Sequence, residues 1–215
     1  GKWMIWGGGS GQRTSDYGTP IGTVANSRTR LVNGQIGLGW YGGKTFFSVG
    51  FKADHGIYGV PFAAQWHDPD HSHEETEKDG ENSPAATDGT EERLQIEAQR
   101  QAVDVTWGLH QISPAIKNLR LSVNVTQWAH DEINVTAGIK EVGTQFDQGQ
   151  FVYRGVFEQE KRGPLTGRFG FWGLLRDYDA VGDEALSPPV DHKAVAIFGL
   201  EELEYDNVKF QFGGR

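Results

Sequence analysis

Hydrophobic and polar residues alternate along much of the chain with a period of two. The clearest case runs from Leu119 to Val125, where leucine or valine occupies every second position and arginine, serine and asparagine lie between them. Because successive side chains of a strand point to opposite faces, this pattern predicts a strand with one apolar and one polar face. Helical periodicity is absent. We expect about nine strands, near residues 2–15, 28–41, 45–56, 92–109, 118–131, 143–159, 166–178, 192–205 and 208–215.

Short and long links alternate between the predicted strands. Short turns lie at 41–44, 113–117, 161–164 and 205–207, and longer polar links lie at 16–27, 57–91, 132–142 and 179–191. Bacterial outer-membrane β-barrels show this order, with short periplasmic turns and longer outer loops. Several strands also reach the about 9–11 residues needed to cross a bilayer at a tilt. The sequence therefore predicts an all-β fold of antiparallel, up-and-down transmembrane β-barrel strands.

The composition agrees with such strands. The 215 residues include 30 glycines, 12% aromatic residues and no cysteine, so disulfides and thiolate metal sites are excluded. Tryptophans near predicted strand ends, such as Trp3, Trp40 and Trp107, match the aromatic girdles of membrane barrels. The mean hydropathy of −0.53 is compatible with a membrane barrel, because lumen-facing polar residues lower the average. A formal charge of −9 argues against a nucleic-acid partner, whose phosphates require a basic surface.

A histidine-rich acidic segment follows the third predicted strand, within the link 57–91. Ten Asp or Glu residues and one lysine lie between His67 and Glu92. Imidazole and carboxylate groups together suit Zn²⁺ and other borderline divalent metals. The candidate ligands are His67, Asp70, His71, His73 and Glu74, with His55 and His130 as secondary candidates. The other interpretation of this segment is a solvated outer loop without a metal, because its composition is also typical of such loops.

The remaining polar residues suggest binding surfaces and no chemistry. Arg120, Asn124, Arg154 and Arg168 fall on the polar sides of their strands and are expected to meet water, a plug or the substrate path. Glu201 and Glu202 could suggest an acid–base pair, but adjacent strand residues point to opposite faces. No nucleophile motif is present, and we do not expect an enzyme.

The segment 166–203 carries the strongest family pattern. A strand is followed by an A-x-G-x-E-A loop, a Pro-Pro step and a second strand that ends in a Glu-Glu pair. The pattern is formed by Ala180, Gly182, Glu184, Ala185, Pro188, Pro189, Glu201 and Glu202. Further matches lie at Asn33-Gly34, at 47–51, at Tyr58-Gly-Val-Pro61 and at Gly143-Thr-Gln-Phe146. With these residues the chain resembles TonB-dependent outer-membrane receptors, a family that includes zinc-uptake members.

This resemblance implies a 22-stranded barrel in the outer membrane of a Gram-negative bacterium, closed by a plug and energised by TonB. Nine strands cannot close a barrel of that size, and the plug and TonB box are absent, so residues 1–215 are expected to be an internal fragment of the barrel domain. The expected function is uptake of a scarce metal ion or chelate, such as zinc or a ferric siderophore. The implied partners are that substrate, TonB through the missing plug, and membrane lipid or lipopolysaccharide; no cofactor is required.

Two alternatives remain open at the level of the sequence. A soluble glycan-binding β-sandwich or carbohydrate-active domain also has many strands, glycine turns and aromatic residues. It would show exposed aromatics in a concave row beside paired carboxylates, whereas a membrane barrel has an apolar belt about 25 Å tall. A plugless, porin-like barrel is the third possibility.

Overall fold

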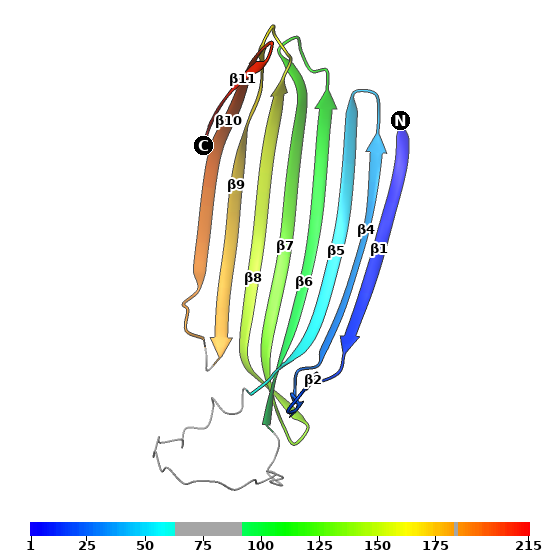
Figure 1. The fold of residues 1–215 in the computed structure, drawn as a ribbon, viewed down its shortest axis with the longest axis vertical. Coiled ribbons are helices and arrows are strands. Elements are labelled where there is room, and N and C mark those ends of the chain that lie inside the picture. Colours follow the sequence, from blue (N-terminus) through cyan, green and yellow to red (C-terminus); the bar gives the residue numbers. More distant parts are fainter. Residues whose placement is uncertain (63–91, 183–184) are drawn as a thin grey trace.

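Nine long strands form one antiparallel sheet in the order in which they occur along the chain (Figure 1). The computed structural model describes residues 1–62, 92–182 and 185–215. The strands are β1 (Lys2–Thr14), β4 (Thr29–Tyr41), β5 (Thr45–Val60), β6 (Glu92–His110), β7 (Ile116–Thr136), β8 (Ile139–Gln159), β9 (Leu165–Gly182), β10 (Val190–Tyr205) and β11 (Val208–Gly214). The predicted all-β, up-and-down architecture is confirmed, and it is consistent with part of a β-barrel. Within the described ranges, no helix is long and apolar enough to span a membrane.

The link between β1 and β4 contains a small hairpin that the sequence pattern did not predict. Its strands are β2 (Gly18–Thr19) and β3 (Gly22–Thr23), which pair with each other and not with the large sheet. Each has only two residues, too few to show a period. The hairpin lies at the end of the sheet opposite the turns that join β4 to β5 and β6 to β7 (Figure 1).

One predicted link was wrong, and several predicted strand ends were too early. Residues 132–142 do not form a long link, because β7 and β8 continue through most of them and only Ala137 and Gly138 separate the two strands. Both turn residues have positive φ, 53° and 83°, as a type I′ hairpin turn requires. The charged residues there resembled a loop, although the alternation continues through Ile133 and Val135. Likewise β5 extends to Val60, so the boundary predicted at 57 lies inside a strand.

The register aligns the apolar sides of all the long strands on one face of the sheet. We call these residues the apolar belt: Trp3, Ile5, Ile36, Leu38, Trp40, Phe47, Val49, Phe51, Val103, Val105, Trp107, Leu121, Val123, Val125, Phe151, Phe171, Leu175, Val195, Ile197, Phe210 and Phe212. One continuous row consists of Ile5, Leu38, Val49, Val105, Val123 and Tyr153, each paired with the next. A one-residue slip in any pairing would move these side chains to the other face.

The apolar belt is not covered by other protein. In the described part of the chain the buried hydrophobic residues are Ala102, Ile133 and Ala180, too few to build a core. Ile5 and Ile197 are 75% and 77% exposed although both are strongly hydrophobic. A soluble sandwich would bury such a face against a second sheet. The described residues form no second layer over the belt.

The apolar belt stops before the end of the sheet at which β1 connects to β4. On β4 the belt face presents Trp40, Leu38 and Ile36, then a glycine and Val32, and finally Arg30. The eight residue steps from Trp40 to Val32 span about 27 Å along the strand. A tilt of 35–45° reduces this to a height of about 20 Å, close to the about 25 Å of a membrane barrel's apolar band.

An arginine at the middle of the belt tests whether this face meets hydrocarbon. Val105→Arg is expected to lower the free energy of unfolding in phospholipid vesicles by about 2–4 kcal/mol, because a cation at the bilayer midplane is poorly solvated. Gln99→Arg, on the same strand and face but six residues, about 20 Å, along β6 from Val105, should cost about 1 kcal/mol or less. Denaturant titrations of both variants would measure the difference. Equal costs for the two positions would contradict a transmembrane belt.

Candidate metal site and polar face

The main candidate metal ligands lie outside the described residues. His67, Asp70, His71, His73 and Glu74 all belong to residues 63–91, which connect β5 to β6. The strands on either side are paired close to this connection, at Val60 and Leu94. The metal site in this segment therefore stays a prediction.

The two secondary candidates, His55 and His130, point to opposite faces of the sheet. His55 pairs with Gln99, and Gln99 pairs with Ala129, so these three residues share one face. His130 is the next residue along β7 and therefore points to the other face. The two imidazoles cannot bind the same metal ion. Within the described ranges, no group of three or more His, Asp or Glu residues is arranged to hold a metal.

Each of these histidines has a local partner that explains its position. His55 lies on the belt side of β5, with its Nε2 atom 3.5 Å from Oε1 of Glu97. His130 lies on the polar side between two aromatic rings, 5.4 Å from the ring centroid of Trp128 and 5.3 Å from that of Phe146. Its side chain is only 17% exposed. Packing accounts for His130 without a metal.

The polar face carries a chain of interactions across three strands. Lys52 Nζ on β5 is 3.1 Å from Oδ2 of Asp104 on β6. The Asn124 amide on β7 donates to Oδ1 of the same carboxylate at 2.8 Å, and Thr126 Oγ1 donates to Asn124 Oδ1 at 2.8 Å. These residues lie opposite the middle rows of the apolar belt. A charged and hydrogen-bonded face there is what a water-filled or plugged barrel interior presents.

A recess of about 480 Å³ lies on the polar face toward the short turns. Arg120, Arg154 and Arg168 line it, from three adjacent strands, together with Asn118 and Glu158. Arg120 lies over the ring of Phe46 and Arg154 over the ring of Phe198, at 5.5 and 5.2 Å from the ring centroids. The sequence analysis expected these arginines on the polar side, and the structure brings them into one recess. It has the charge to hold an anionic group or a carboxylate-bearing protein segment.

The alternation pattern could not identify the Lys52–Asp104–Asn124 chain. Each residue was assignable to a polar side, but their contact depends on register between strands that are 20 to 52 residues apart in sequence. Opposite charges at neighbouring polar positions of consecutive strands are the only sequence signal for such a contact.

An antiparallel nine-stranded sheet with one exposed apolar face and one charged face is consistent with part of a β-barrel. A solved structure with this arrangement of strands is that of the copper transporter OprC, which matches with a TM-score of 0.65 and 13% sequence identity. The match covers 97% of this chain and 31% of that chain, so the chain spans about a third of the transporter's length. No family model and no curated protein sequence matches the chain. At this identity the likeness concerns the fold.

The exposure of the polar chain determines how strongly its charges couple. Lys52 and Asp104 side chains are 52% and 40% exposed, so water screens their attraction. A double-mutant cycle with Lys52→Met and Asp104→Asn is expected to give a coupling of about 0.2–1 kcal/mol in denaturant unfolding. A coupling well above that range would mean that the polar face is shielded from water.

Proposed function

We propose that this chain forms part of the barrel of a TonB-dependent outer-membrane receptor that imports a scarce metal ion or metal chelate, such as zinc or a ferric siderophore. The main support for this proposal is the apolar belt, which nine antiparallel strands expose on one face of the sheet while the other face is charged. Hydrocarbon is the medium that stabilises such a face, and closed β-barrels are the sheet structures that span it. The likeness of the strands to those of a copper transporter supports transport of a metal.

In this proposal the polar face lines the interior of the barrel. The arginine recess contacts the acidic or polar surface of a plug. The Lys52–Asp104–Asn124 interactions hold the neighbouring polar side chains of β5, β6 and β7 in place and keep this part of the interior polar. Transport requires capture, release and movement of the plug, and no bond of the substrate is broken. TonB supplies the energy through the plug, which is outside the chain described here.

Capture of the metal is assigned to the histidine-rich segment between β5 and β6. Three imidazoles interleaved with carboxylates suit Zn²⁺ and bind Cu²⁺ at least as strongly, because Cu²⁺ lies above Zn²⁺ in the affinity order of divalent metals. The segment leaves the sheet at the end beyond the apolar belt, where β5 and β6 end and begin. In an outer-membrane barrel the end with the longer loops faces the external medium, so in this proposal the histidines of the segment meet metal ions outside the cell.

The soluble alternatives fit the sheet less well. A glycan-binding β-sandwich needs a second sheet against the apolar face, and the described strands other than the small β2–β3 hairpin belong to one sheet. The aromatic row formed by Trp3, Trp40, Phe47 and Trp107 lies at one margin of the exposed belt, beside aliphatic residues, which is where a membrane barrel carries an interfacial girdle. A plugless porin-like barrel shares the belt and differs from the proposal in needing no energy source.

Replacement of the three loop histidines tests the metal assignment. The variant His67→Ala/His71→Ala/His73→Ala is expected to bind Zn²⁺ and Cu²⁺ more than about tenfold less tightly in calorimetric titration, a loss of about 1.4 kcal/mol or more. The control is His110→Ala/His192→Ala, which removes two imidazoles from other parts of the strands. Unchanged affinity in the triple variant would exclude capture by this segment.

Energy dependence separates a TonB-dependent receptor from a porin-like barrel. Cells that produce the full-length protein are expected to accumulate radioactive zinc or ferric siderophore under metal limitation, and dissipating the proton gradient should stop the uptake. A porin-like barrel would equilibrate small solutes with or without the gradient. Uptake that persists at its full rate after an uncoupler is added would contradict the proposal.

A further inference from the structure

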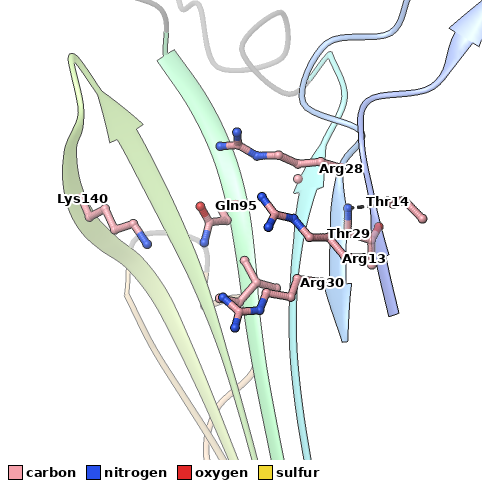
Figure 2. A pocket seen from close by; sticks show the side chains of 9 residues that line it. Arg13, Thr14, Arg28, Thr29, Arg30, Gln95 and Lys140 are labelled. Atoms are coloured by element: carbon pink, nitrogen blue, oxygen red, sulfur yellow. Dashed lines mark hydrogen bonds between the residues drawn. The ribbon is translucent and has the colours of Figure 1, made fainter. Parts of the chain in front are cut away.

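Four cationic side chains converge beyond one end of the apolar belt. A cavity of about 300 Å³ is lined by Arg13 from β1, Arg28 from the link before β4, Arg30 from β4 and Lys140 from the start of β8. Figure 2 shows the three guanidinium groups extending toward the same side, with the Lys140 side chain pointing back toward them. Thr14, Thr29, Ile57, Gly59 and Gln95 complete the lining, which contains no carboxylate. We call the four cations the basic cluster.

Two members of the basic cluster are direct neighbours in the sheet. Arg13 and Arg30 are paired residues of the antiparallel β1–β4 ladder, so their side chains leave the same face side by side. Like charges that are directly opposite on adjacent strands destabilise a sheet. Among the described residues, none of the four cations forms an ion pair, although the chain has 29 acidic residues against 20 basic ones. Such a repulsive arrangement would be relieved by an anion bound between the cations.

The backbone around Arg28 is held in place before any anion binds. Its N–H donates to Oδ1 of Asp16 at 2.8 Å, and its carbonyl accepts from the N–H of Gly59 at 3.1 Å. The next residue, Thr29, donates its N–H to Thr14 Oγ1 at 3.0 Å. Arg28 therefore extends from a fixed point of the link between β1 and β4. Fixed donors lose less entropy when they bind a ligand.

Asn26 fastens the same link to the neighbouring strands. It adopts a left-handed φ of 58°, which asparagine tolerates better than most residues. Its amide Nδ2 donates to the carbonyls of Val60 and Leu94 at 3.0 and 2.8 Å. One side chain thus joins the link to the end of β5 and the beginning of β6. The link that carries Arg28 is therefore fastened to two neighbouring strands.

The position of the cluster relative to the belt indicates the source of the anion. Arg13 and Arg30 lie on the belt face, and Arg30 is two residues beyond Val32, the last apolar belt-side residue of β4. Two residues are about 7 Å along a strand, a distance that leads from the hydrocarbon boundary into the headgroup layer. Arginine binds phosphate oxygens with two parallel N–H donors, and a headgroup phosphate lies at this depth.

We propose that the basic cluster of Arg13, Arg28, Arg30 and Lys140 is a binding site for the phosphate of a phosphorylated lipid in the outer leaflet. The inference rests on the proposed membrane location of the belt. The lipid's acyl chains lie along the belt side of β1 and β4, and its phosphate bridges Arg13 and Arg30 and relieves their repulsion. Arg28 and Lys140 contact the remaining phosphate oxygens or a second phosphate of the same headgroup.

The test measures stabilisation of the full-length protein by a defined phosphorylated lipid. The protein is folded into phosphatidylcholine vesicles with or without ten mole per cent diphosphorylated lipid A, and its urea unfolding midpoint is recorded. Lipid A is expected to raise the midpoint of the wild type and to leave Arg13→Gln/Arg30→Gln unchanged. In phosphatidylcholine alone this variant should unfold at the same or a higher urea concentration than the wild type, because one repulsive pair has been removed. That result distinguishes lost binding from misfolding.

The control is Arg100→Gln/Arg176→Gln, which removes two cations from the polar face of the sheet. It should keep the full response to lipid A. Equal responses of both double variants would overturn the proposal, because the effect would then be a general attraction of charge. A third arm adds inorganic phosphate to the phosphatidylcholine vesicles; if phosphate alone reproduces the stabilisation, the site takes free anions and the lipid assignment is wrong.

Failure of this inference and failure of the proposed function give different results. If the protein does not insert into either kind of vesicle, the membrane barrel itself is refuted. If it inserts and binds metal but lipid A does not change its unfolding midpoint, only the lipid site is refuted. Protein that inserts and responds to lipid A supports both.

Discussion

The structure depends on a backbone hydrogen-bond ladder that joins nine strands and shifts register only between β7 and β8, next to Ile116 and Glu132. Between β1 and β7 the pairing continues without a bulge, so each side chain's face follows from its position in the chain. Val49, Val105 and Val123 belong to three separate strands, and they form one apolar row only when these strands are paired in this register. The same pairing places Asp104 beside Lys52 and Asn124 on the other face. The apolar belt and the polar face are therefore both determined by the register of the strands.

The two faces are stabilised in different ways. The belt side buries very little against protein, and in the proposed membrane location its aromatic and aliphatic residues would gain stability by leaving water for an apolar medium. The polar side relies on hydrogen bonds, ion pairs and arginines stacked on aromatic rings, of which Arg120 over Phe46 is one. Neither side resembles the close-packed core of a soluble domain. For this reason the sheet is consistent with part of the wall of a β-barrel.

The period-two pattern was sufficient to predict the number, direction and approximate ends of the nine strands. It failed at Ala137 and Gly138, because a two-residue turn among charged residues has the composition of a loop. The contacts that matter for binding were harder to predict, since they depend on register. The pairing of Arg13 with Arg30 and the separation of His55 from His130 onto opposite faces follow only once each strand is aligned with its neighbours. The metal ligands of residues 63–91 were proposed from composition and lie outside the described residues.

The pairing of Val60 with Leu94 has a consequence for how this architecture can change over evolution. The two ends of the connecting segment are held beside each other by the ladder, whatever the segment contains. Doubling the length of a flexible connection between fixed ends costs only about 0.6 kcal/mol in closure entropy. New ligand sets can therefore be inserted or exchanged there without disturbing the wall. In the proposed receptor, a change of substrate would then require the replacement of one segment while the strands keep their sequence pattern.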